Sequence, residues 1–270
     1  MGTKENAEQR ELLYARLDDL CGLSLRGELG VSDFLSPADL HFASAYLRRR
    51  GVSFSSFGGY SDAERRRIYI FPDYMGDDGA FSGDVEAFLE AFGFSDDISA
   101  VKIIGSGYRR LTHRDFLGSV LGLGIERAVV GDILITECDG KEAVLLCDGS
   151  IAEFIISELT SVANDKVRTK KIGRGEWNAP ERRMQPIHDT VASGRLDAVV
   201  AALCNLSRDK ARTAVESGLV EIDFESEERP DRAVNAPAII SVRGVGKFRV
   251  LSLCDKTKKG RYRLEAEKYL

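Results

Sequence analysis

Residues 195–224 read RLDAVVAALCNLSRDKARTAVESGLVEIDF, and this stretch decides the fold of the last third of the chain. Its first part places four apolar side chains on one helical face, at Leu196, Val199, Val200 and Leu203. Ser207 is expected to cap a second helix, and Gly218 to close it in the left-handed position. LVEIDF then predicts a strand, so two short packed helices lead directly into a sheet.

Basic side chains gather at the start of the second predicted helix. Arg208 and Arg212 lie four residues apart on one helix face, and Lys210 adds charge at the same end. A helix N-terminus favours phosphate, because its N–H groups are free and the helix dipole is positive there. Arg195 opens the preceding helix, and the two strands predicted within AIISVRGVGKFRVLSL (238–253) carry further cations. These residues together predict a surface for a polyanion.

The arrangement RLD, LSR-x-K-A-R and G-L-V-x-I resembles the S4 domain, which several RNA-modifying and ribosome-associated proteins share. The resemblance implies an S4 (αL) RNA-binding fold. It also implies an RNA site formed by Arg195, Ser207, Arg208, Lys210, Arg212, Arg243, Lys247 and Arg249. Two residues depart from the pattern, since Glu221 stands where a basic residue is frequent and Asp223 where Asn is usual. We expect this edge of the sheet to face away from phosphate.

Charge is divided unevenly along the chain. The net charge is −5, but residues 1–165 carry 16 Lys and Arg against 28 Asp and Glu, whereas residues 166–270 carry 22 against 15. A polyanion-binding surface is therefore expected in the C-terminal part.

Composition predicts a soluble globular protein of the cytoplasm. The hydrophobic fraction is 43% and the charged fraction 30%, and no apolar run is long enough to span a membrane. The five cysteines include no C-x-x-C pair and the three histidines lie near no cysteine pair, so we expect no metal site. We also expect no cofactor, no membrane partner and no small-molecule substrate.

The 270 residues have room for two or three domains, and the chain is expected to be an α+β protein of three. These are a small α+β domain at residues 1–80, a middle domain with its linker at 81–180, and the S4 domain at 181–270. The elements predicted in the first are helices at 5–20 and 37–50 and strands at 52–57 and 67–71.

The middle domain is predicted to have the ferredoxin-like, or RRM-like, βαββαβ fold. Its elements in chain order are residues 98–104, 112–121, 132–136, 142–147, 150–159 and 162–172. A turn-rich break at 77–83 and a short helix at 84–92 precede it, and 173–186 reads as a linker without a hydrophobic period. RNA-binding RRMs stack bases on aromatic residues of two central strands. Neither VKIIG (101–105) nor DKVRTKKI (165–172) has them, which favours a structural or protein-docking role for this domain.

Three further segments narrow the resemblance. SFGGYSDAERRRIYIFPDY (56–74), LTHRDFLGSVLGLGIERAVVGDIL (111–134) and RGVGKFRV (243–250), in this order, resemble the bacterial YlmH family of S4 proteins. The resemblance covers nearly the whole chain. It implies an RNA-binding factor on the ribosome that binds large-subunit rRNA, tRNA or both. It further implies a role in translation quality control, namely the rescue of stalled subunits, and a link to cell division.

Two alternatives stay open at this point. GRLD (194–197) resembles the catalytic motif of pseudouridine synthases, in which the Asp is the nucleophile, and those enzymes often carry an S4 domain. Their motif continues into a Thr-Ser-Gly turn, whereas here a helix continues, so Asp197 is expected to interact with the helix dipole and a neighbouring Arg. We expect this chain to have no catalytic residues and no enzymatic activity. The other alternative is a factor that docks on the ribosome through protein contacts.

Overall fold

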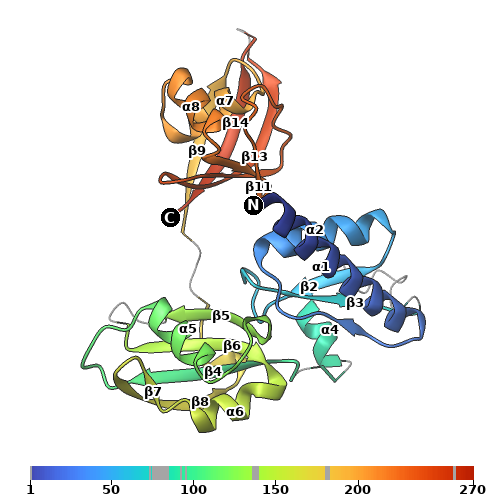
Figure 1. The fold of residues 1–270 in the computed structure, drawn as a ribbon, viewed down its shortest axis with the longest axis vertical. Coiled ribbons are helices and arrows are strands. Elements are labelled where there is room, and N and C mark those ends of the chain that lie inside the picture. Colours follow the sequence, from blue (N-terminus) through green and yellow to red (C-terminus); the bar gives the residue numbers. More distant parts are fainter. Residues whose placement is uncertain are drawn as a thin grey trace. The chain divides into compact units, whose positions relative to one another are not determined.

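A computed structural model describes residues 2–72, 74, 85–91, 93–94, 96–135, 140–179, 183–257 and 260–270. The chain divides into two compact units, residues 1–180 and 181–270. Both combine helices with sheets (Figure 1), so the expected α+β class is confirmed. The finer division at residue 80 stays a prediction. The expected break at 77–83 lies outside the described residues.

The N-terminal part of unit 1 is a three-stranded antiparallel sheet with two helices on one face. Its elements are α1 (Gly2–Leu25), β1 (Gly30–Val31), α2 (Pro37–Arg49), β2 (Phe54–Phe57) and β3 (Arg67–Ile70), and the strand order is β1-β3-β2. Ser36 caps α2 by accepting the Asp39 N–H at 3.1 Å. The predicted pair of helices and pair of strands are confirmed.

Strand β3 is buried on both faces because it lies between two cores. Ile68 and Ile70 belong to the core under α1 and α2, together with Leu17 and Leu47. Side chains alternate along a strand, so Tyr69 points to the opposite face and into a second core that includes middle-domain residues. The N-terminal elements therefore bury part of their apolar surface on the middle domain.

The middle domain has the predicted ferredoxin-like order. Its elements are α4 (Val85–Ala91), β4 (Ile98–Gly105), α5 (His113–Leu121), β5 (Val130–Ile135), β6 (Glu142–Asp148), α6 (Ala152–Glu158), β7 (Ser161–Val162) and β8 (Asp165–Ile172). The strand order is β5-β6-β4-β8-β7, and neighbouring strands are antiparallel. Thr112 and Asp115 form the expected capping box of α5. Helices α5 and α6 cover one face of this sheet (Figure 1).

The strand that should be compared with RNA-binding RRMs is not the one expected. Among the four long strands, β4 and β6 lie at the centre and β8 lies to one side. The treatment of residues 165–172 as a central strand was therefore wrong. The reason is the split βαβ topology, which inserts β4 between β6 and β8. Strand β6 reads EAVLLCD and has no aromatic residue either.

The face of this sheet that α5 and α6 leave open is largely covered by the N-terminal elements. Ala100 of β4 and Leu146 of β6 lie in one buried cluster with Phe34 and Phe57. Trp177 packs against the same cluster. The central positions of the sheet are therefore part of a protein core rather than an open surface.

Buried polar groups join the same two parts of unit 1. Asp132 of β5 accepts hydrogen bonds from the Tyr60 hydroxyl at 2.9 Å and from the backbone N–H groups of Glu64 and Arg65 at 2.7 and 3.1 Å. Arg67 of β3, itself buried, pairs with Asp148 at 2.8 Å and with Asp97 at 3.0 Å. Such groups are costly to bury unless they are paired, so they fix one arrangement of the two parts.

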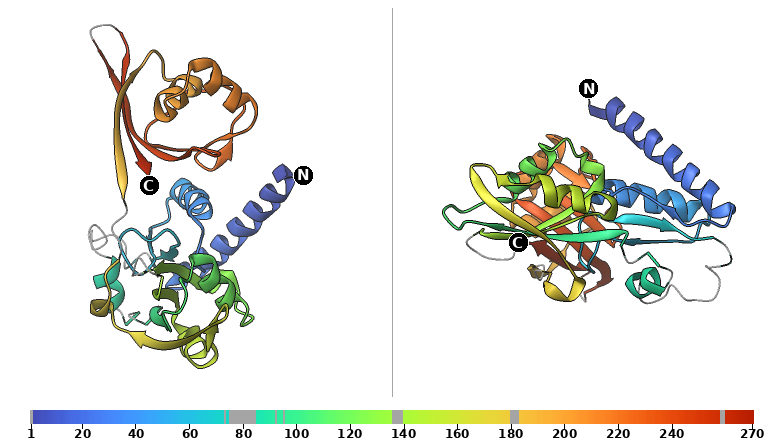
Figure 2. Two further views of the ribbon diagram at one scale, coloured as in Figure 1. Left: turned by 90° about the vertical axis from the view of Figure 1, so that its left-hand side faces the viewer. Right: turned by 90° about the horizontal axis from the view of Figure 1, so that it is seen from below.

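Unit 2 is a six-stranded antiparallel sheet with a helix pair on one side. Its elements are β9 (Met184–Val191), α7 (Leu196–Cys204), α8 (Arg208–Glu216), β10 (Val220–Ile222), β11 (Glu225–Ser226), β12 (Ala238–Val242), β13 (Gly246–Lys256) and β14 (Tyr262–Tyr269). The strand order is β11-β10-β12-β13-β14-β9. Figure 2 shows the helices in orange beside the long red strands β13 and β14. The two helices and three strands predicted from residues 195–253 are present.

The predicted linker at 173–186 is shorter than expected. A 3₁₀ turn at Arg174–Glu176 and the half-buried Trp177 continue unit 1, and Met184 already begins β9. Pro186 was read as part of a linker, but it lies in β9, which is the edge strand of the sheet. An edge strand accommodates a residue that cannot donate a ladder hydrogen bond.

Candidate RNA-binding site

A buried carboxylate organises the start of both helices of unit 2. Asp197, in the first turn of α7, has a side chain only 5% exposed and lies 3.1 Å from Nη2 of Arg208 and 3.3 Å from Nε of Arg195. Burial alone would raise the pKa of Asp197, but hydrogen bonds from the two arginines hold it below its ordinary value. The carboxylate is therefore charged and fixes both guanidinium groups.

The start of α8 presents the remaining cations. Ser207 caps this helix as expected, and its hydroxyl accepts the Lys210 N–H at 3.4 Å. Lys210 is exposed, and Arg212 is exposed while paired with Glu216 at 2.8 Å on the helix surface. An exposed pair of this kind is weak and readily exchanged for another anion. Arg208, Lys210 and Arg212 thus lie within the first five residues of α8.

The start of α7, in contrast, is closed by the chain itself. The N–H groups of Leu196 and Asp197 donate to the carbonyl oxygens of Arg232 and Pro230 at 2.8 and 3.0 Å. Arg232 is held in turn by Glu227, a buried carboxylate that accepts from its guanidinium group at 2.6 Å. Of the two helix N-termini, α8 is therefore the one with room for phosphate.

Glu227 and its arginines were missed in the sequence. Hydrogen bonds from Arg229 and Arg232 lower the pKa of Glu227 to about 2. Residues 225–232 read ESEERPDR. The alternation of acidic and basic residues around Pro230 was the available signal for an internally paired loop.

The cations of the sheet lie apart from those of the helices. Phe248 and Val250 of β13 are fully buried in the core, so the alternate residues Lys247 and Arg249 point to the opposite face. Arg249 pairs there with Glu267 of β14 at 2.6 Å.

Lys247 lies over two aromatic rings, with Nζ 5.0 Å from the centroid of Phe224 and 5.4 Å from that of Tyr269. Arg243 is exposed in the β12–β13 turn, where its N–H donates to the carbonyl of Leu219, just after α8. The eight predicted residues therefore fall into two groups, five at the helices and three on or beside β13.

The two departures from the S4 pattern have different structural settings. Asp223 has a left-handed backbone with φ 50°, and its carboxylate accepts the Ile239 N–H at 2.9 Å. Asn and Asp are the non-glycine residues that tolerate this conformation, so Asp223 can replace Asn in a structural role. Glu221 of β10 is exposed, and it lies opposite Ser241 of β12.

Among the described residues, no helix is both long and apolar enough to cross a membrane. Within the same residues, no group of three or more His, Cys, Asp or Glu side chains could hold a metal ion.

Comparison with known proteins places the chain in a family. Over 240 residues it is 32% identical to the ribosome-associated protein quality control protein P2 of Bacillus subtilis (strain 168), a match that covers 88% of this chain and 86% of that protein. A family model described as "Putative RNA-binding domain in YlmH" matches residues 97–176. The chain belongs to the YlmH family.

The YlmH model matches the middle domain and not the S4 unit. Its description names RNA binding for the domain in which the RRM-type aromatic residues are absent. A solved structure, the cell division protein ylmH from Streptococcus pneumoniae, is also similar, with 24% identity and a TM-score of 0.47, covering 63% of this chain and 93% of that one.

Proposed function

We propose that this chain is a ribosome-associated RNA-binding protein, and that unit 2 binds RNA phosphate at the start of α8. The observation that carries the proposal is the placement of Arg208, Lys210 and Arg212 within the first five residues of that helix, with Arg195 fixed beside them by Asp197. Cations and helix N–H groups both favour phosphate, and binding to the backbone releases counterions. The name of the B. subtilis relative supports the ribosome as the location of the RNA.

We also propose which RNA is bound and in which process. The RNA is rRNA of the large subunit, with tRNA as a second ligand, and the protein acts in quality control on stalled subunits with a link to cell division. The relative's name supports quality control. Sedimentation of the full chain with separated large and small subunits, with and without bound tRNA, tests each part.

We propose that this protein has no catalytic activity on RNA. The pseudouridine synthase alternative needs Asp197 as a nucleophile, but this carboxylate is buried and engaged by two arginines. The test is incubation with a uridine-rich rRNA fragment followed by pseudouridine detection. Product that disappears in Asp197→Asn would overturn the proposal.

The phosphate site is tested with a variant that leaves the buried carboxylate paired. Lys210→Ala with Arg212→Ala removes two exposed cations, and each phosphate contact contributes about 0.7 to 0.9 to the slope of log affinity against log salt. We expect this double variant to lower the slope for an rRNA fragment by about 1.4 to 1.8. Arg48→Ala with Arg49→Ala, two exposed cations of α2, is the matched control. An unchanged slope in the folded double variant would favour docking through protein contacts instead.

A further inference from the structure

The positive charge of the C-terminal part does not belong mainly to the S4 unit. Residues 181–270 carry 17 Lys and Arg against 14 Asp and Glu, whereas residues 166–180 carry 5 against 1. More than half of the excess therefore lies on β8 and the turn after it, which are part of unit 1. The middle domain therefore carries a group of cations on β8. The division of the charge at residue 165 did not separate these cations from those of unit 2.

The cations of β8 share one face of the sheet. Lys166, Arg168 and Lys170 are exposed and alternate with Val167 and Thr169, which face the helices. The Thr169 hydroxyl donates to a carbonyl of α6 at 2.9 Å, which fixes the direction of the alternation. The three cations consequently lie on the face that α5 and α6 do not cover.

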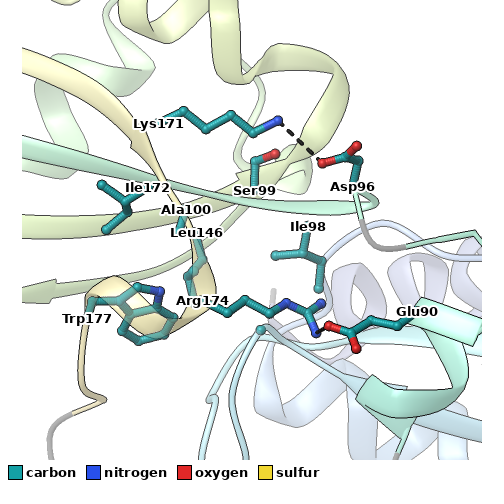
Figure 3. Close-up of a pocket in the computed structure, with 12 residues that line it drawn as sticks. Glu90, Asp96, Ile98, Ser99, Ala100, Leu146, Lys171, Ile172, Arg174 and Trp177 are labelled. Atoms are coloured by element: carbon teal, nitrogen blue, oxygen red, sulfur yellow. Dashed lines mark hydrogen bonds and ion pairs between the residues drawn. The ribbon is translucent and has the colours of Figure 1, made fainter.

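Most of the same face is already occupied by protein. At one end, Ala100 and its strand partner Ile172 belong to the core shared with the N-terminal elements. A pocket of about 530 Å³ lies beside them (Figure 3), but Lys171 is paired there with Asp96 at 3.4 Å and Arg174 with Glu90 at 3.6 Å. The opposite end of the sheet, near Gly105, is where the β8 cations are exposed.

An exposed aromatic ring lies at that open end. Tyr108 is 96% exposed and is followed by Arg109 and Arg110, both exposed. The loop is held to the start of β8, because the Ser106 N–H and hydroxyl both donate to Asp165, next to Lys166. Asp165 alternates with Lys166 and Arg168 and so lies on the helix side of the strand, which means that the loop and the β8 cations share the end of the sheet rather than one face. A tyrosine ring so fully in water gains nothing from the fold.

We propose that this open end is a second RNA-contact surface, on which Tyr108 stacks with an unpaired base while Lys166, Arg168 and the loop arginines bind the flanking phosphates. Single-stranded nucleic acid is bound by just this combination of an aromatic platform and a cationic groove. The surface differs from the usual RRM platform because the central positions are covered. It rests on the proposed RNA-binding function but uses none of the S4 residues.

The probe is a 12-nucleotide oligouridylate that carries one 5-iodouridine, which cross-links to an aromatic ring stacked on it. The full chain is used with Lys210→Ala and Arg212→Ala, so that the S4 site contributes little. We expect the cross-link at Tyr108, and Tyr108→Ala should weaken binding about 5- to 150-fold, since stacking of one base is worth about 1 to 3 kcal/mol. Tyr108→Phe should retain both the cross-link and the affinity. Tyr74→Ala, at a tyrosine 72% exposed, is the matched control.

Charge is tested separately from stacking. Lys166→Ala with Arg168→Ala should lower the salt slope for the oligouridylate by about 1.4, at about 0.7 for each phosphate contact on a single strand. Arg48→Ala with Arg49→Ala should not change it. Cross-links confined to unit 2, with unchanged affinity in Tyr108→Ala, would overturn the inference and leave the S4 site standing. A cross-link at Tyr108, together with an unchanged salt slope for the rRNA fragment in Lys210→Ala with Arg212→Ala, would support this surface and overturn the phosphate site at α8.

Discussion

At the scale of single residues, one carboxylate sets the orientation and the effective charge of two arginines that are predicted to bind RNA. Asp197 fixes Arg195 and Arg208, so the remaining donors of both guanidinium groups have set directions. The same carboxylate cancels part of their charge. We therefore expect the exposed cations Lys210 and Arg212 to carry most of the salt-dependent attraction of the proposed site, and Arg195 and Arg208 to supply directed hydrogen bonds.

Arg208→Ala should be more destabilising than its position on the surface suggests. The change leaves Asp197, almost fully buried, with Arg195 as its remaining guanidinium partner. We expect the free energy of unfolding to fall by about 1 to 2 kcal/mol, because a buried acceptor loses charged donors. Arg212→Ala should cost less than about 0.5 kcal/mol, since its pair with Glu216 is exposed. Urea unfolding followed by circular dichroism measures both, and equal effects would contradict the role given to Asp197.

Glu227 makes the stability of unit 2 depend on pH. Its pKa is about 2 in the folded protein and 4.5 ordinarily, so the carboxylate stabilises the fold above about pH 4.5 and loses this effect as the pH falls through 2. Glu227→Gln should lower the melting temperature at pH 7, and the difference from the unmodified protein should shrink toward pH 2. Calorimetry is the suitable measurement, because the single tryptophan, Trp177, lies in unit 1. A difference that is constant with pH would show that the pairing is not the cause.

At the scale of elements, the sequence predicted those whose apolar residues repeat strongly. The helices α7 and α8 and the four long strands of the middle domain were found from periodicity and caps. The edge strand β9 was missed because it contains Pro186 and follows a segment rich in arginine. Strand β14, which lies between β13 and β9, reads YRLEAEKY and was missed as well. Leu264 and Ala266 are its buried core residues and Tyr262 packs beside them, so three of its eight residues are all that periodicity could use.

The contact between the two parts of unit 1 could not be predicted from local patterns. Asp132 lies within an apolar strand, and its three donors come from residues some seventy positions earlier. The candidate site shows the same limit. The cations at α8 were identified from spacing and resemblance, but the closure of α7 by residues 227–232 depends on contacts across a loop.

Asp132→Ala should loosen the middle domain from the N-terminal elements. The change leaves the Glu64 and Arg65 N–H groups and the Tyr60 hydroxyl without their acceptor in a partly buried setting. We expect a loss of about 2 to 4 kcal/mol in the free energy of unfolding. Tryptophan fluorescence suits this measurement, since Trp177 packs on the shared core. Asp33→Ala, whose exposed carboxylate is 3.9 Å from Arg16, is the control and should cost less than about 0.5 kcal/mol.

At the scale of the whole molecule, the cores show which parts of the chain depend on one another. Among the described residues, every buried member of the unit 2 core lies between Val191 and Ala266. The N-terminal and middle parts, in contrast, share the cluster around Tyr69 and Leu146. RNA contacts proposed for the middle domain and for unit 2 thus belong to units with separate cores.

Residues 181–270 should therefore fold and bind RNA without the rest of the chain. Trypsin has sites at Arg182 and Arg183, between the half-buried Trp177 of unit 1 and the first strand of unit 2, so brief digestion should yield the two units first. The isolated unit 2 should melt cooperatively, because its core is complete. It should keep the salt-dependent binding that Lys210→Ala with Arg212→Ala weakens, and it should not form the oligouridylate cross-link expected at Tyr108. Early cleavage within β13, or a unit 2 that is unfolded after release, would contradict the division of the molecule and with it the independence of the two RNA surfaces.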